Sequence, residues 1–178
     1  MPMHSASSSN PLKSEALGKK PLSSSRNFVL RDAAVADAKI IARFEKIFFG
    51  DRSFDECRLD EEDVIEYFSD PDTRFIFACV DDVPVGYAVG WVHDGMVETL
   101  SLGVLAEHRR SGAASALLRA IEAWGKDRSV AVAQLESHIA KEHPGKFYPT
   151  QGYSVAKQVP GYYFDGGDAP VWRKAIAL

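Results

Sequence analysis

The pattern of apolar and polar residues predicts alternating strands and helices from residue 27 onward. Apolar residues recur three or four positions apart where a helix is expected, and they form short runs bounded by turn residues where a strand is expected. Two-residue turns at Asp81-Asp82 and Asp94-Gly95 join three successive strands into an antiparallel meander. The expected strands are 27–31, 74–80, 85–93, 96–104, 130–136, 153–159 and 171–176, and the expected helices run over 38–48, 64–68 and 114–124.

Together these elements predict one α/β (α+β) domain with a mixed sheet. A meander is antiparallel, whereas a strand that returns through a helix pairs in parallel, so both arrangements are expected. This domain comprises residues 26–178, which hold every aromatic residue of the chain. Residues 1–25 are rich in serine and too poor in apolar residues to fold, so we expect a disordered tail. Pro144 and Pro149 limit any helix between them to a short one.

Composition and charge argue against several classes of function. The chain is 46% hydrophobic and carries a net charge of −4, so it lacks the basic excess that usually accompanies binding to nucleic acid or to anionic membranes. No apolar run is long enough to span a bilayer, and we expect no secretory signal. Cys57 and Cys79 stand apart and the histidines show no metal-ligand spacing, so we expect neither a disulfide framework nor a metal site. These features predict a cytoplasmic protein.

A short basic loop carries the clearest chemical signal in the chain. It follows the strand 96–104 and leads into a helix whose first residues are small. Backbone N–H groups at a helix start lack hydrogen-bond partners and carry partial positive charge, which suits a phosphate group. The alternative is a solvated arginine pair before an ordinary amphipathic helix. The residues expected to hold a pyrophosphate are Arg109, Arg110, Ser111, Gly112, Ala113 and Ala114.

Several short motifs accompany the basic loop in a fixed order along the chain. They are Pro84-Val85-Gly86-Tyr87, Leu135-Glu136, Phe147-Tyr148, Gly152-Tyr153 and the segment from Gly161 to Ala169. With Arg109, Gly112 and Ala114 of the loop, they resemble the GNAT family of N-acetyltransferases, in particular the branch related to ribosomal-protein alanine N-acetyltransferases. The resemblance implies a mixed, mostly antiparallel sheet of about seven strands flanked by roughly three to four helices. It also implies direct transfer of acetyl from acetyl-CoA to a primary amine.

Glu98 is the first candidate for a general base. In strict alternation it shares a strand face with Leu100, Leu102 and Val104, and an apolar setting raises the pKa of a carboxyl group. Its position before the basic loop also resembles that of the glutamate base in family members that acetylate histones. The alternative is an edge carboxylate without a catalytic role.

Glu136 and Tyr148 form a second candidate pair. Their spacing resembles that of the glutamate and tyrosine in the ribosomal-alanine enzymes, which implies a base and an acid. Glu136 shares a face with Gln134, so we expect milder desolvation than at the first candidate, and the two glutamates could act together through water. A phenol can protonate the departing thiolate of CoA, and Tyr162 or Tyr163 are alternative donors.

Gly103 interrupts an apolar strand, which predicts a bulge or a close approach of another group to the backbone. In the family that the chain resembles, this strand splays from its neighbour so that pantetheine pairs with it. The resemblance therefore implies that the backbone amides of Leu102 and Val104 bind the cofactor. A simple kink is the alternative.

The expected function is acetylation of a primary amine, with acetyl-CoA as co-substrate and no metal. The acceptor is either a peptide N-terminus or a small amine metabolite. Two other classes are a non-catalytic module that binds acyl-CoA and regulates a partner, and a nucleotide-binding protein. The acidic segment 51–63 either attracts a cationic acceptor or is a solvated run before a helix.

Overall fold

One mixed sheet runs through the part of the chain that the structure describes. The structure is a computed structural model and describes residues 27–50, 59–137, 142–163 and 165–176. Within them, seven strands follow the order β1-β2-β3-β4-β5-β7-β6, and the β4–β5 pair is parallel while the other pairs are antiparallel. The strands are β1 (Val29–Asp32), β2 (Thr73–Val80), β3 (Val83–His93), β4 (Met96–Val104), β5 (Val132–Glu136), β6 (Ser154–Val159) and β7 (Ala169–Ala175). The helices are α1 (Ala38–Phe49), α2 (Glu61–Phe68), α3 (Ala113–Asp127) and α4 (Glu142–Thr150), with 3-10 turns at Val35–Asp37 and Ala106–His108.

These elements confirm the predicted mixed α/β sheet and the order of its parts. The fifth strand begins two residues later than expected, because Ser129 with φ of 61° and the bond from the Val130 N–H to the Gly125 carbonyl extend the turn after α3. The prolines were expected to limit any helix between them to a short one, but α4 runs over nine residues and includes both Pro144 and Pro149. Pro144 falls in its first turn, where a proline is tolerated. The expected tail 1–25 and most of the acidic segment, residues 51–58, lie outside the described residues.

The two predicted hairpins form through turns of the same kind. Asp81 and Asp82 have φ of 50° and 63°, and Asp94 and Gly95 have φ of 46° and 75°. Two consecutive residues with positive φ are typical of the type I′ turn, whose twist matches that of the strands it joins. The meander from β2 to β4 therefore rests on local turn chemistry.

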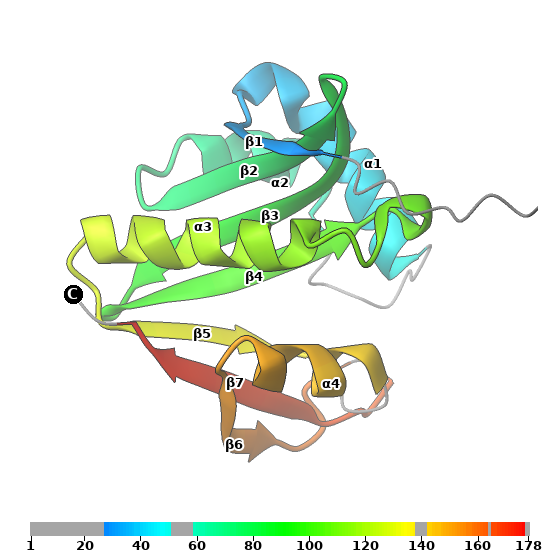
Figure 1. The fold of residues 1–178 in the computed structure, drawn as a ribbon. Coiled ribbons are helices and arrows are strands. Elements are labelled where there is room, and N and C mark those ends of the chain that lie inside the picture. The colour runs from blue at the N-terminus through cyan, green and yellow to red at the C-terminus, as the bar shows by residue number, and fades with distance from the viewer. Residues whose placement is uncertain (1–26, 51–58, 138–141, 164, 177–178) are drawn as a thin grey trace, which may run out of the picture.

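Helices cover both faces of the sheet (Figure 1). α3 packs on one face, where Leu117 and Ile121 belong to the larger apolar cluster. α1 and α2 cover the opposite face, where Ile41 and Phe44 belong to a second cluster. α4 lies on the same face as α3, since Tyr148 packs against the larger apolar cluster, which is called the cluster of α3 below.

β4 and β5 pair over a short stretch and then diverge. Residues 96–98 of β4 are opposite residues 132–134 of β5. Beyond them β4 continues to Val104 and β5 to Glu136 with no further pairing between these two strands, and Figure 1 shows them spreading apart. Most of β4, residues 99–104, thus has a sheet neighbour on the β3 side alone.

β4 contains one extra residue, Leu100, relative to β3. Its neighbours Thr99 and Ser101 are opposite Gly90 and Val89, which are consecutive in β3. This arrangement is a β-bulge. Because side chains alternate along a strand, an inserted residue exchanges the two faces for everything beyond it.

The bulge changes the surroundings of Glu98. Strict alternation predicted that Glu98 shares a face with Leu102 and Val104, but these two pack against the cluster of α3. Val97, next to Glu98, also belongs to that cluster, so Glu98 faces the side of α1 and α2. The predicted apolar face for Glu98 is therefore wrong, because the residue pattern does not reveal the bulge.

Gly103 lies beneath the ring of Phe48 from α1. A Cβ at this position would come within 2.1 Å of a ring carbon, so a glycine is required. The predicted close approach is confirmed, while the bulge of the same strand lies at Leu100. Phe48 also stacks on Tyr87, with ring centroids 5.9 Å apart, and this contact holds α1 against the middle of the sheet.

Candidate active site

The diverging part of β4, residues 99–104, presents some backbone groups that no described strand pairs with. The N–H of Leu105 donates to the carbonyl of Val85 at 2.8 Å. Since hydrogen-bonding directions alternate along a strand, the N–H and C=O groups of Leu102 and Val104 point away from β3. In agreement, the carbonyl of Val104 accepts from Arg109 Nε at 3.3 Å. The two residues predicted to bind the cofactor through their backbone thus lie on the free edge.

The loop after β4 leads into a helix start without a side-chain cap. Arg110 and Gly112 have φ of 59° and 90°, a left-handed conformation that turns nearby N–H groups into a concave anion-binding arrangement. The N–H of Ala113 donates to Ser111 Oγ at 3.3 Å, whereas no described group accepts from the N–H of Ala114. No atom lies within 4 Å of where a Cβ on Gly112 would be, so a ligand can reach this backbone. The six residues predicted to hold a pyrophosphate, here called the cradle, therefore lie together at the start of α3.

Glu98 and Glu136 lie side by side where β4 and β5 part. Glu98 is the last residue of β4 that is opposite β5, and it faces α1 and α2. On β5, Leu135 packs against the cluster of α3, so its neighbour Glu136 also faces the side of α1 and α2. The side chain of Glu98 acts on that of Glu136 by hydrogen bonding and by charge, and both effects raise the pKa of Glu136. The structure brings together the two candidate bases, whose joint action through water was one expectation from the sequence.

Gln134 links the carboxyl pair to β7. Its Nε2 donates to Glu136 Oε1 at 3.2 Å, and its Oε1 accepts from Arg173 Nε at 2.7 Å. The face that Gln134 shares with Glu136 was predicted and is confirmed. Because the amide oxygen is engaged by the guanidinium, the amide N–H is directed at the carboxyl group.

The pKa of Glu136 is raised to about 8, and burial is the largest cause. Hydrogen bonding to Glu98 and the charge of Glu98 also raise this pKa, while the cations Lys157 and Arg173 lower it. The expectation of mild desolvation at Glu136 is wrong, because a polar neighbour in the sequence does not say how much protein covers the group. The nearby carboxyl group of Glu98 therefore helps Glu136 to keep its proton at neutral pH.

His93 extends the carboxyl pair, a contact that sequence reasoning missed. Its Nε2 lies 2.6 Å from Glu98 Oε2 and its Nδ1 lies 3.3 Å from Asp94 Oδ2. Its ring stacks on Trp91 with centroids 4.0 Å apart. The hairpin was a usable signal: its two-residue turn places Trp91 opposite Glu98, so that His93 is the diagonal neighbour of Glu98 on the same face.

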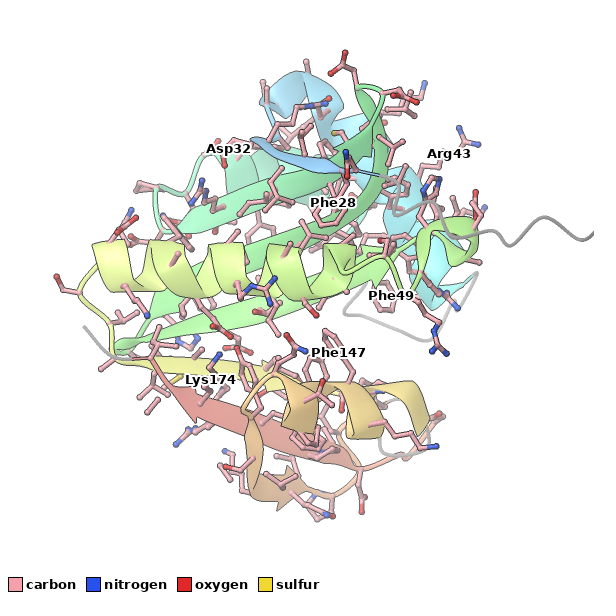
Figure 2. All side chains as sticks on the ribbon, viewed as in Figure 1. Phe28, Asp32, Arg43, Phe49, Phe147 and Lys174 are labelled. Carbon is pink, nitrogen blue, oxygen red and sulfur yellow. The ribbon has the colours of Figure 1, made fainter. Side chains whose placement is uncertain are left out.

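Tyr148 lies on α4, on the other face of the sheet from the carboxyl pair. Its ring centroid is 5.8 Å from that of Trp172 and 6.0 Å from that of Tyr153. Burial raises the pKa of Tyr148 to about 12, so it is a proton donor at neutral pH. In Figure 2, the neighbouring Phe147 points from α4 toward the region where β4 and β5 diverge. The predicted acid and the predicted bases thus lie on opposite faces of the sheet.

Glu45 of α1 is a buried carboxyl that sequence reasoning also missed. It is 1% exposed and accepts hydrogen bonds from Ser101 Oγ, at 2.7 Å, and from the Tyr87 hydroxyl. Burial, followed by the charge of Glu45, raises the pKa of Tyr87 well above its usual range, which keeps that hydroxyl a donor. A signal was present, since Glu45 falls on the apolar stripe of its helix, four residues after Ile41. The network fastens α1 to β3 and β4.

The remaining expectations concern other donors, metals and membranes. Tyr162 and Tyr163 lie in the connection between β6 and β7, and Tyr162 is 44% exposed. The described residues contain no group of three or more side chains that could hold a metal ion. None of the described helices combines the length and apolar character needed to cross a bilayer.

Two curated proteins are similar in sequence to the chain. An uncharacterized N-acetyltransferase from Methanocaldococcus jannaschii is 33% identical over 96 residues, which cover 53% of this chain and 62% of that protein. The match thus spans less than two thirds of this relative. An N-alpha-acetyltransferase from Saccharolobus solfataricus is 25% identical over 164 residues, which cover 85% of this chain and 95% of that protein.

Solved structures share the fold, and a family pattern covers the site. A ribosomal-protein-alanine N-acetyltransferase from Brucella melitensis has a TM-score of 0.70 at 16% identity, covering 83% of this chain and 99% of that one. The protein yncA from Salmonella typhimurium, solved with its cofactor acetyl-CoA, has a TM-score of 0.70 at 16% identity, covering 85% and 95%. The pattern of the acetyltransferase (GNAT) family matches residues 41–153, which include the loop, β4 and β5. The chain therefore belongs to the acetyltransferase (GNAT) family and is an N-acetyltransferase.

Proposed function

We propose that the protein transfers acetyl directly from acetyl-CoA to a primary amine and that its acceptor is a peptide N-terminus. The observation that carries this proposal is the carboxyl pair Glu98–Glu136 at the point where β4 and β5 part. The carboxyl pair lies on the sheet face that α1 and α2 cover, next to a free strand edge that can hold a cofactor. The likeness to an N-alpha-acetyltransferase over 85% of the chain supports an N-terminal acceptor.

The backbone of β4 and the start of α3 suit an elongated ligand that ends in a pyrophosphate. Leu102 and Val104 would pair with the amide groups of pantetheine as an added strand. The pyrophosphate would be held by the N–H of Ala114, which has no acceptor among the described residues, and by the exposed guanidinium groups of Arg109 and Arg110. The free edge and the cradle are consecutive in the chain, so one ligand can occupy both.

Glu136 and Glu98 would accept the proton that the acceptor must lose. An amine attacks a thioester only in its neutral form, and Glu136, whose pKa is raised to about 8, can take a proton from an ammonium group. In the transfer, a C–N bond forms and the C–S bond breaks. The ammonium nitrogen loses two protons in all. One goes to the carboxyl pair, and the other is matched by the proton that the departing thiolate takes up.

Tyr148 would supply the proton to the departing sulfur. Its hydroxyl makes no hydrogen bond to any described residue, so it is available to a ligand, and its raised pKa keeps it protonated until a thiolate forms beside it. Because the tyrosine and the carboxyl pair lie on opposite faces of the sheet, they can serve the leaving group and the attacking nitrogen separately.

Thiol release from acetyl-CoA in the presence of different amines tests this proposal. We expect saturable release with peptides that begin with Ala or Ser, and slower release with lysine peptides and polyamines. Fastest release with polyamines would instead identify a small-amine enzyme. Calorimetry with CoA on the folded protein serves as the binding control. Binding without release for any amine would indicate a non-catalytic module, and absence of binding would refute the proposed function.

A further inference from the structure

A line of four side chains leads from the carboxyl pair to solvent. Glu98 acts on Glu136 by hydrogen bonding and by charge, and Glu98 Oε2 lies 2.6 Å from His93 Nε2. On the far side of the ring, His93 Nδ1 lies 3.3 Å from Asp94 Oδ2. Side-chain exposure rises outward, from 15% at Glu98 to 21% at His93 and 87% at Asp94. The line therefore begins at covered carboxyl groups and ends in water.

Acetylation of an ammonium group leaves one proton behind in every turnover. The reactants are a thioester and an ammonium ion, and the products are an amide, a neutral thiol and one proton. A carboxyl base holds that proton when the products leave and must lose it before the next cycle. Glu98 is mostly covered by protein, so its direct exchange with water is restricted.

We propose that His93 carries this proton from the carboxyl pair to solvent, an inference that rests on the proposed acetyl transfer. An imidazole can accept a proton at Nε2 and release the other proton from Nδ1, so that one proton crosses the ring without leaving a net charge on it. Here Nε2 faces the carboxyl group and Nδ1 faces the exposed side. The geometry thus gives each ring nitrogen a separate partner.

The surroundings favour His93 over other groups for this role. The stacked ring of Trp91 holds the imidazole plane in a fixed direction. Arg173 also acts on the pair, but a guanidinium keeps its protons at all ordinary pH values. Lys157 acts on Glu136 through its charge from β6. His93 differs from both cations because it contacts the pair directly and its two ring nitrogens face different partners.

His93→Gln, measured by thiol release in weakly buffered solution, tests the relay. Glutamine can still hydrogen-bond to Glu98 but cannot pass a proton through. We expect kcat to fall about tenfold or more while the KM for acetyl-CoA stays the same. A second variant, His93→Ala, leaves space for a small base, and we expect added imidazole to restore its kcat in a saturable manner. A residue that merely holds Glu98 in position would not respond to a proton carrier in this way.

The control and the refuting results follow from the same assay. Asp81→Asn changes a turn residue of the other hairpin, with φ of 50° against 46° at Asp94, and should leave kcat unchanged. Calorimetry with CoA verifies that each variant is folded. Wild-type kcat in His93→Gln, or a loss in His93→Ala that imidazole does not relieve, overturns the relay. Wild-type protein that releases no thiol with any amine overturns the proposed function instead, so the two failures are distinguishable.

Discussion

Replacing Glu136 by glutamine tests the carboxyl pair most directly. Glutamine keeps the length of the side chain and can still accept the hydrogen bond from Gln134, but it cannot take up a proton. We expect kcat to fall by about 10²- to 10⁴-fold, the usual contribution of one acid–base group. The KM for acetyl-CoA should stay unchanged, because Glu136 faces away from the start of α3.

The pH dependence gives this prediction a magnitude. With a pKa of about 8, Glu136 is roughly one-tenth ionised at pH 7 and roughly nine-tenths ionised at pH 9. If the ionised pair accepts the proton, the kcat of the wild type should rise about tenfold between these pH values. Glu136→Gln should lack this rise, because the group that titrates is gone.

The assay is thiol release from acetyl-CoA at saturating substrate between pH 6 and pH 10. The assay is repeated with two acceptor amines of different pKa. The part of the pH–rate profile that reports the enzyme stays at the same pH when the amine is changed, whereas the part that reports the acceptor moves. Glu66→Gln, an exposed glutamate of α2, is the matched control and should behave like the wild type. Full activity in Glu136→Gln, or a pH limb that persists in it, would refute the reasoning.

The same substitution makes a prediction about stability that does not depend on activity. Because folding raises the pKa of Glu136 from 4.5 to about 8, its contribution to stability is full below pH 4.5 and is lost as the pH rises through 8. Glu136→Gln should therefore match the Tm of the wild type at pH 5 and exceed it at pH 9, by about 2–4 °C for each kcal/mol involved. An equal difference in Tm at both pH values would contradict the assigned pKa.

Three further substitutions test the acid, the cradle and the packing around β4. Tyr148→Phe should lower kcat by about 10²- to 10⁴-fold with little change in Tm, and unchanged thiol release would remove its assigned role. Replacing Arg109 and Arg110 by alanine should raise the KM for acetyl-CoA, and the affinity of the wild type should weaken as salt is added; steady-state kinetics at two ionic strengths measures both effects. Gly103→Ala should cost about 1–3 kcal/mol in thermal unfolding because of the clash with Phe48, and Phe48→Leu in the same chain should recover part of it.

The sequence by itself determined the parts of this protein that depend on near neighbours. Asp94 and Gly95 specify a hairpin because their own backbone preferences suit the turn. The cradle before α3 is likewise local: Arg110 and Gly112 take up the left-handed conformation within a few residues of the helix start. The order of strands and helices followed from periodicity, which each segment carries in its own side chains.

Only the tertiary structure decided that the carboxyl groups of Glu98 and Glu136, which are distant in the chain, lie close to each other. Glu98 faces the side of α1 because Leu100 bulges against β3, and a bulge depends on the register between two strands. The raised pKa of Glu136 arises from burial and from Glu98, which lies 38 residues earlier in the chain. Desolvation and Coulomb interaction act through space, so their strength is set by the packing of segments that the sequence lists far apart.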